Sequence, residues 1–228
     1  MSILRRKAQT FELQVQDVTL RITANPELYE EARAAVLQFS DRLNAYAARN
    51  PRFRTSKLPV ELPDDAPDLM REIAEQCALA GLGPQFAFGG ALTDHLGRFL
   101  SQRERDVVIA SGGGYYAATR KRTKLTVFQG EDFGEGLAIA VDPTHGPVGI
   151  YTTMGRRDLP VDSVDGLVVQ ATSCTLADAA GTYALGVFAK PDSMKAGLEY
   201  LQGVPGVLGA MVIRDGSIGV AGGLEIAA

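Results

Sequence analysis

The order in which two hydrophobic periodicities occur along the chain constrains its fold more than any other feature. Residues 11–22 alternate apolar and polar side chains in two short runs, which predicts a hairpin with one buried face. Helical spacing follows over residues 25–48, and again over 68–80 and 86–100. Because strands and helices do not alternate strictly afterwards, we expect an α+β fold with mixed or antiparallel sheets and packed helices.

The rest of the chain fits the same fold class. Four prolines interrupt residues 50–67, so we expect an extended connector there and no regular helix. Beyond it we expect strands at 106–110, 125–129, 137–141, 148–152 and 167–171, helices at 175–188 and 193–202, and strands at 206–213 and 217–226. Since no linker separates these segments, they predict a single domain over residues 10–226 with an N-terminal tail at 1–9.

The small number of His and Cys side chains limits the metal sites and reactions that this protein could support. The 228 residues include two His, two Cys and no Trp, whereas Gly occurs 25 times. A zinc site made only of Cys and His would need all four residues, and they lack paired ligand spacing. The widely separated Cys77 and Cys174 exclude a disulfide scaffold and are typical of a reducing cytoplasm. Catalysis would therefore have to use backbone groups, carboxylates and hydroxyls.

Charge and hydropathy exclude further classes of protein. The net charge of −4 argues against a dedicated nucleic-acid binder. The basic run at 120–124 could hold phosphates, but it is also typical of a solvated turn or edge strand. No apolar run approaches the ~20 residues of a membrane helix, and no signal-like apolar stretch follows the basic N-terminus. We therefore expect a cytoplasmic protein without membrane association.

The segment TSCTLADAAGT at 172–182 contains the most informative spacing of polar residues. Asp178 and Thr182 are four residues apart and so lie on one face of the expected helix. With a nearby main-chain carbonyl, that of Ala177, they offer hard oxygen ligands suited to Mg²⁺, which leaves positions for waters and substrate phosphates. The simpler alternative is an Asp that stabilises the helix dipole, with Thr182 packed against its neighbours.

Consecutive glycines follow the strand expected at 106–110. Residues 112–114 are all Gly, so their backbone N–H groups can approach a phosphate closely. The run matches neither a Walker loop nor a dinucleotide-binding fingerprint. A tight turn explains the same three residues.

The third expected helix contains Gly89 and Gly90. Each costs about 1 kcal/mol in a helix interior, so either close packing or the approach of a ligand must compensate. Asp94 follows Gly90 on the same helical face. His95 could titrate near neutrality, but a single His is usually structural, and Cys174 has no evident His partner that would make it a nucleophile.

Several segments, taken in order, resemble an uncharacterised family of ApbE-like proteins. They are "RLNAYAARNPRFRTSKLPVELPDDAPDLM", "AGLGPQFAFGGALTD", "VVIASGGG", "GPVGIYTTMGR" and "TLADAAGTYAL", and the resemblance extends over residues 10–225. More distantly, residues 83–185 resemble the ApbE-type flavin transferases. Those enzymes use Mg²⁺ to transfer FMN from FAD onto a Thr or Ser hydroxyl of a target protein, and they release AMP. The resemblance implies an ApbE-like α+β fold.

The most specific match is to the Ala-Asp-Ala-x-x-Thr segment of the transferases. It implies that Asp178 and Thr182 hold the metal and act in catalysis, and that Ala177 completes the metal set. The matching glycine, helix and threonine segments imply a cofactor-binding set of Gly89, Gly90, Asp94, Gly112, Gly113, Gly114, Thr152 and Thr153. Three features of the transferases are missing. Gly89 stands in place of their Lys, no Asp follows the glycine turn, and their His-x-x-Asp-Pro-x-x-Gly motif has no counterpart.

These expectations leave two main functions open, and a nucleic-acid contact through the basic run at 120–124 is a weaker third. In the first, the protein is a Mg²⁺-dependent enzyme that binds FAD, FMN or a related nucleotide and transfers FMN to an acceptor protein. In the second, the same cleft holds a small or cofactor-like ligand without turnover, which the missing groups favour. Open strand edges in the second half of the chain favour a homodimer in either case.

Overall fold

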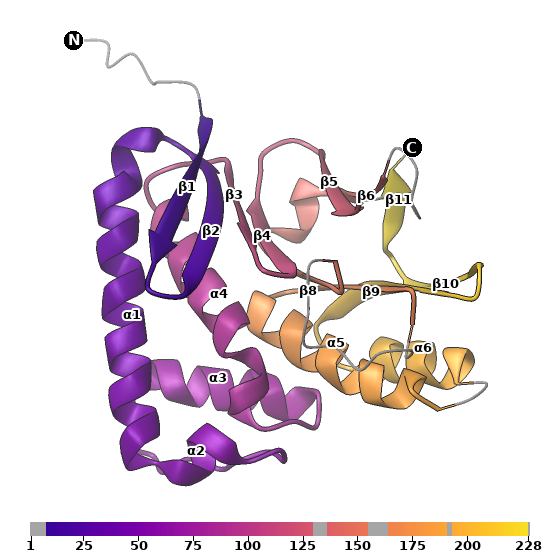
Figure 1. Ribbon diagram of the computed structural model, residues 1–228, viewed down its shortest axis with the longest axis horizontal. Helices are drawn as coiled ribbons and strands as arrows, with labels where there is room; N and C mark the ends of the chain where they lie inside the picture. Colours follow the sequence, from indigo (N-terminus) through magenta and orange to yellow (C-terminus); the bar gives the residue numbers. More distant parts are fainter. Residues whose placement is uncertain (1–7, 130–135, 155–163, 191–192, 228) are drawn as a thin grey trace.

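A computed structural model describes residues 8–129, 136–154, 164–190 and 193–227 (Figure 1). The tail expected at 1–9 lies mostly outside these ranges. Within them the strands are β1 Gln9–Val15, β2 Val18–Ala24, β3 Val107–Ser111, β4 Gly114–Ala118, β5 Thr123–Phe128, β6 Leu137–Val141, β7 Val148–Thr152, β8 Gly166–Ala171, β9 Val207–Arg214, β10 Ser217–Gly222 and β11 Glu225–Ala227. The helices are α1 Tyr29–Arg49, α2 Pro51–Thr55, α3 Asp68–Leu79, α4 Phe88–Ser101, α5 Cys174–Phe188 and α6 Met194–Gly203.

The strands form two antiparallel sheets. The larger has the order β1-β2-β3-β4-β7-β8-β9-β10, and the smaller has the order β11-β6-β5. Figure 1 shows helices α1 to α6 gathered on one side of the large sheet and the small sheet on the other. The α+β class expected from the sequence is therefore confirmed. Strands β1 and β10 end the large sheet within the described residues, and the homodimer expected from open edges stays a prediction.

The large sheet is buried on both faces over its central strands. One apolar cluster lies between this sheet and the helices, and the other lies between it and the small sheet. Period-two alternation divides the strands between the clusters. Tyr116 and Val169 belong to the helical side, whereas Tyr115 and Val168 belong to the side of the small sheet.

Two of the expected elements near the N-terminus are confirmed and one is wrong. Strands β1 and β2 form the expected hairpin, and Asn25 accepts a hydrogen bond from the backbone N–H of Glu27 as the cap of a 3-10 helix, Pro26–Leu28, that leads into α1. The connector at 50–67, however, begins with a short helix, α2. Pro51 occupies its first turn, where a missing N–H costs nothing because that group has no intrahelical partner.

The second half departs from expectation at two strands. Strand β4 was not expected, because its sequence GYYAA is short and has no polar alternation. The strand expected at 217–226 is two strands, which belong to different sheets. Gly222 has a φ of +68°, and this left-handed backbone turns the chain away from β10 before β11 starts.

Close approach of α4 to α5 depends on a missing side chain. A Cβ on Gly90 would lie 2.5 Å from the carbonyl oxygen of Cys174, at the start of α5. On the opposite side of that helix start, a Cβ on Gly149 of β7 would lie 2.1 Å from the backbone nitrogen of Cys174. The start of α5 is therefore held between α4 and the sheet. None of the described helices has the length and apolar character needed to cross a membrane.

Candidate functional site

The glycine run is the turn of the β3–β4 hairpin. Ser111 pairs with Gly114, so Gly112 and Gly113 alone connect the two strands, with φ values of +33° and +131°. The Gly113 carbonyl accepts a hydrogen bond of 2.7 Å from the backbone N–H of Thr152 on β7. The turn explanation is therefore correct for these glycines, and their backbone is still bare enough for a ligand to approach.

Helix α5 brings a carboxylate to this turn. Ser173 caps the helix, because its hydroxyl accepts a hydrogen bond of 3.0 Å from the backbone N–H of Leu176. One turn later comes Asp178, which is 8% exposed. Its Oδ2 lies 3.7 Å from the position of a Cβ on Gly89, and its Oδ1 lies 3.8 Å from that of a Cβ on Gly114. Gly89 thus leaves space directly in front of the carboxylate, whereas a Cβ on Gly114 would meet the carbonyl oxygen of Ile150 at 2.8 Å, so that this glycine allows close packing of β4 against β7.

Asp94 fixes the start of α5 from the neighbouring helix. Its carboxylate accepts hydrogen bonds from the backbone N–H groups of Cys174 at 2.7 Å and Thr175 at 2.8 Å. It accepts a third from the Thr175 hydroxyl at 2.6 Å. An anion at a helix N-terminus is stabilised by the unpaired N–H groups and the helix dipole. The side chain of Asp94 is therefore directed at α5.

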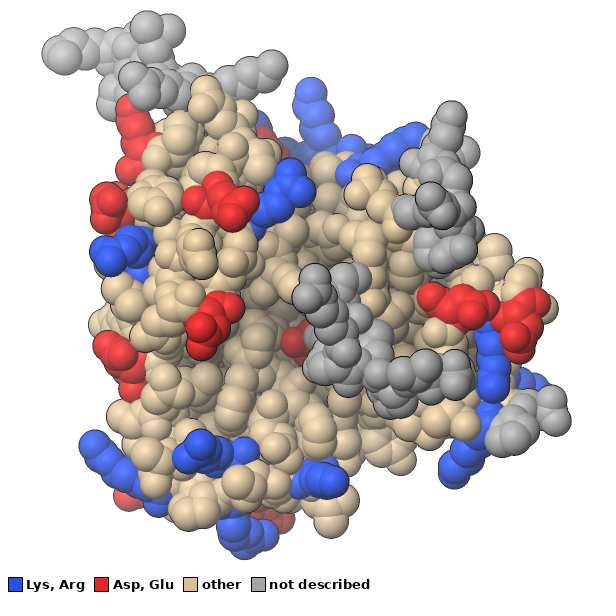
Figure 2. Space-filling view, viewed as in Figure 1, with Lys and Arg blue, Asp and Glu red and all other residues tan. Residues whose placement is uncertain are grey.

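Two adjoining cavities meet at the glycine turn. The smaller, of about 130 Å³, is lined by Gly89, Gly90, Thr93, Ser111, Gly112, Gly114, Tyr115, Ile150, Cys174 and Asp178. The larger, of about 330 Å³, is lined by Thr19, Arg21, Ala110, Ser111, Gly112, Gly113, Gly114, Tyr115, Thr152 and Met154. In Figure 2 the middle of this face is hollowed, with a basic side chain at its upper rim and an acidic one deeper inside. The two cavities share Ser111, Gly112, Gly114 and Tyr115, and we refer to the two together as the hollow.

Most of the expected site residues surround this hollow. The smaller cavity collects Gly89, Gly90, Gly112, Gly114 and Asp178, and the larger adds Gly113 and Thr152. The expected residues that line neither cavity are Asp94, Thr153, Ala177 and Thr182.

The threonine hydroxyls expected at the site bond to the backbone. The Thr152 hydroxyl donates to the carbonyl of Val127 at 2.9 Å, and the Thr153 hydroxyl accepts from the N–H of Leu167 at 3.0 Å. Gly155, which completes the threonine segment, lies outside the described residues. These hydroxyls hold the end of β7 against β5 and β8.

Sequence reasoning missed several lining residues. Thr93, Tyr115 and Ile150 reach the smaller cavity, and Thr19 and Arg21 reach the larger one. The alternation in 18–22 does place the last two on the polar face of their strand. Nothing in the sequence, however, indicates that this face borders the glycine turn, because that contact depends on pairing between β2 and β3.

Burial controls the ionisation of the groups near Asp178. Burial, with a smaller effect of the Asp94 charge, raises the pKa of Cys174 well above its usual value. Burial and the Asp178 charge raise the pKa of Cys77 to about 12. Burial also raises the pKa of Tyr115, and the positive charge of Arg21 opposes that shift. Both Cys side chains are therefore neutral thiols near pH 7, which does not suit a nucleophile.

His95 is directed away from the hollow. Its ring packs against Phe39 of α1, with the ring centroids 5.2 Å apart. Burial, together with the charges of Arg98 and Arg42, lowers its pKa. The structural explanation for this His fits its position between α1 and α4.

The side chains around Asp178 can be tested for their ability to coordinate a metal ion. No group of three or more His, Cys, Asp or Glu suited to a metal occurs in the part of the chain that the structure describes. Mg²⁺ is often bound by one or two carboxylates, with waters and substrate phosphates filling the other positions. A carboxylate beside the space that Gly89 leaves open fits that kind of binding.

Solved ApbE structures share this architecture. The ApbE protein of Thermotoga maritima superposes with a TM-score of 0.62 at 12% identity, over 93% of this chain and 97% of that one. The apo form of the flavinyl transferase ApbE of Pseudomonas stutzeri gives a TM-score of 0.53 at 12% identity, over 97% and 96% of the two chains. At such identities the likeness shows the fold alone. The protein is thus of the ApbE-like α+β class.

A family model described as AbpE bacteria matches residues 1–193, and the chain belongs to that family. A UPF0280 protein of Methanocella arvoryzae is 25% identical over 215 residues, which cover 93% of this chain and 87% of the relative. A UPF0280 protein of Methanopyrus kandleri is 27% identical over 213 residues, which cover 90% and 86%. The relationship to ApbE proteins expected from the motifs is confirmed.

Proposed function

We propose that this protein binds a flavin nucleotide together with Mg²⁺ and transfers FMN from FAD to a hydroxyl of an acceptor protein. The observation that carries the proposal is the convergence of Gly89, Gly90, Gly112, Gly114 and Asp178 around one cavity. These residues come from α4, from the β3–β4 turn and from α5, and they meet only in the folded chain. Membership of the ApbE-like family supports the choice of ligand.

In this proposal Asp178 is the main protein ligand of Mg²⁺, with the Thr182 hydroxyl and the Ala177 carbonyl as further oxygen donors. Bound Mg²⁺ supplies positive charge against the phosphoryl oxygens of the ligand. The residues of the chain orient that ligand. The backbone at Gly112, where a Cβ would meet nothing within 4 Å, lets a diphosphate approach closely, and Gly89 leaves room in front of the carboxylate.

The transfer balances without any protein nucleophile. The acceptor hydroxyl oxygen forms a bond to the phosphorus of the FMN half of FAD, and the bond from that phosphorus to the AMP oxygen breaks. AMP leaves with the electron pair of this bond, and the hydroxyl proton is released to solvent. Charge stabilisation and positioning therefore supply the catalysis, in keeping with neutral thiols at Cys77 and Cys174.

The test is turnover of FAD by the purified protein with Mg²⁺ and an acceptor peptide that contains Ser or Thr. Liquid chromatography measures AMP release, and mass spectrometry measures the gain of FMN on the peptide. Asp178→Asn should reduce the rate by 10²-fold or more, on the order of the loss expected when a charge stabiliser is removed. Asp41→Asn, on the exposed face of α1, is the matched control and should keep the wild-type rate. Wild-type protein that neither binds FAD nor releases AMP would disprove the proposal.

One observation favours a second function, retention of a flavin nucleotide without turnover. None of the described residues that line the cavity at Asp178 is Lys, Arg or His, and Gly89 stands where the transferases have a Lys. Without that cation, charge that develops on the phosphates during transfer is less well stabilised. Tight binding of FAD by the wild type, with no AMP released over hours, would select this function.

A further inference from the structure

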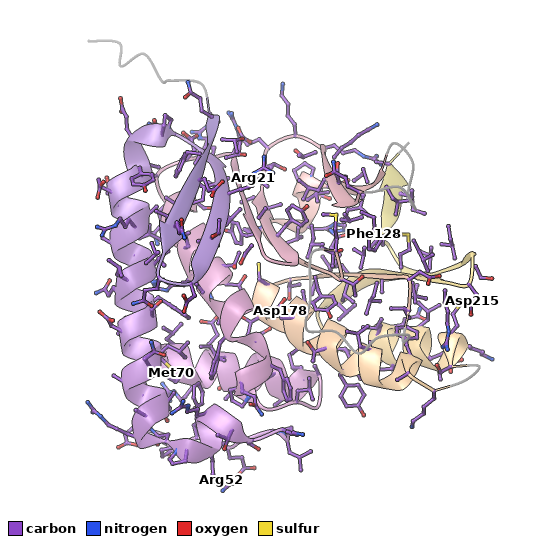
Figure 3. All side chains as sticks on the ribbon, in the orientation of Figure 1. Arg21, Arg52, Met70, Phe128, Asp178 and Asp215 are labelled. Carbon is purple, nitrogen blue, oxygen red and sulfur yellow. The ribbon has the colours of Figure 1, made fainter. Side chains whose placement is uncertain are left out.

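A cation lies on the far side of the glycine turn from Asp178. Arg21 on β2 lines the larger cavity together with Thr19, which is two residues earlier and therefore on the same face of the strand. In the sheet register Arg21 pairs with Ala110, which pairs in turn with Tyr115. Figure 3 labels Arg21 on β2 in the upper part of the view and Asp178 at the start of α5 below it.

Arg21 is not neutralised within the described part of the chain. Glu12 is its cross-strand partner on β1, yet no ion pair joins the two exposed side chains. Arg21 is the single charged residue among those that line the larger cavity, and Asp178 is the single charged residue among those that line the smaller one. The larger cavity therefore carries a positive charge and the smaller one a negative charge.

The surroundings of Arg21 suit an oxyanion of phosphate type. A guanidinium offers several N–H donors in a planar fork that matches the spacing of phosphate oxygens. The Thr19 hydroxyl adds a donor from the same strand, and the bare turn at 112–114 allows a bulky anion to approach. At the opposite end, Asp178 without a metal repels an anion.

We propose that Arg21, with Thr19 and the turn at 112–114, is a phosphate-binding subsite that orients a nucleotide within the hollow. The ligand is a flavin nucleotide, a choice that rests on the proposed function. The subsite itself requires only a phosphate group, so the two ideas can fail separately.

The contribution of Arg21 to phosphate binding can be measured by comparing ligands that carry phosphate with one that does not. Isothermal titration in EDTA gives dissociation constants for FMN, for riboflavin and for inorganic pyrophosphate, so that no divalent metal contributes at Asp178. Arg21→Gln should raise the dissociation constants of FMN and pyrophosphate by about 10- to 100-fold, because both ligands carry phosphate. The dissociation constant of riboflavin, which carries none, should stay unchanged. Arg21→Lys keeps the charge but loses the planar fork, so it should lie between wild type and Arg21→Gln. Arg33→Gln, on the exposed face of α1, is the matched control and should bind all three ligands like the wild type.

The outcomes separate the subsite from the flavin proposal. If Arg21→Gln binds FMN and pyrophosphate as tightly as the wild type, or loses riboflavin to the same extent as FMN, the subsite is refuted. If the wild type binds pyrophosphate through Arg21 but binds neither FMN nor riboflavin in EDTA, nor FAD in the presence of Mg²⁺, the subsite stands and the flavin function fails. If the wild type does not bind pyrophosphate at all, the subsite is overturned whatever the flavins do.

Discussion

Asp94→Ala tests whether a buried carboxylate of α4 holds the start of α5 in place. The wild-type carboxylate accepts three hydrogen bonds of 2.6–2.8 Å from Cys174 and Thr175. Alanine leaves these donors without their acceptor, and each such buried group costs about 1–3 kcal/mol. Cys174 lines the smaller cavity, so water can replace part of what is lost. We expect the free energy of unfolding to fall by about 3–5 kcal/mol.

Urea unfolding followed by circular dichroism measures this difference in the free energy of unfolding. Two further variants show how much of it comes from the charge of Asp94 and how much from the Thr175 hydroxyl. Asp94→Asn keeps one acceptor oxygen and loses the charge, so it should cost about 1–2 kcal/mol. Thr175→Val removes only the hydroxyl donor and should cost about 1 kcal/mol. A double-mutant cycle between Asp94→Ala and Thr175→Val should show a coupling of about 1 kcal/mol, because both variants break the same contact.

The result that would refute this reasoning is an Asp94→Ala protein whose unfolding free energy lies within about 1 kcal/mol of the wild type, below the cost of one unsatisfied buried donor. A protein of unchanged stability with weakened flavin binding would instead support the cofactor-binding role that the sequence resemblance implies for Asp94. Stability and ligand affinity together therefore distinguish a positioning residue from a binding residue.

Two other predictions concern α4. A Cβ on Gly90 would lie 2.5 Å from the Cys174 carbonyl oxygen, so Gly90→Ala should lower the free energy of unfolding by about 3 kcal/mol. A Cβ on Gly89 would meet only Asp178 Oδ2, at 3.7 Å, so Gly89→Ala should raise the free energy of unfolding by up to about 1 kcal/mol. Equal effects in chemical denaturation would contradict this packing. Burial lowers the pKa of His95, so the unfolded chain takes up a proton below about pH 6.5 that the folded protein does not, and stability falls as the pH drops through that range. Thermal melts of His95→Gln between pH 7 and 5 should show a smaller loss than the wild type, and identical slopes would exclude His95 as the cause.

Hydrophobic periodicity and helix capping, which are local sequence patterns, predicted much of the fold. The alternation in 11–22 predicted a hairpin, and the Asn25 cap correctly marked the start of the first helical region, because period and capping depend on residues close together in sequence. The helix after Pro51 and the strand β4 were missed, since a single helical turn and a short apolar strand have little periodicity to detect. The division of 217–226 was also missed, because it depends on which sheet each half joins.

The candidate site, like the fold, was predictable from the sequence only in part. Sequence by itself determined which residue types could act, namely carboxylates, hydroxyls and bare glycine backbone, and the motif around Asp178 indicated the family. Tertiary structure alone decided that Gly90 makes room for a helix start while Gly89 faces the cavity, that Asp94 is directed at α5, and that Arg21 reaches the glycine turn from the N-terminal hairpin. The physical reason is that each of these contacts joins segments far apart in the chain. Neither hydrophobic period nor residue spacing specifies which faces of two distant elements meet; packing and strand register do.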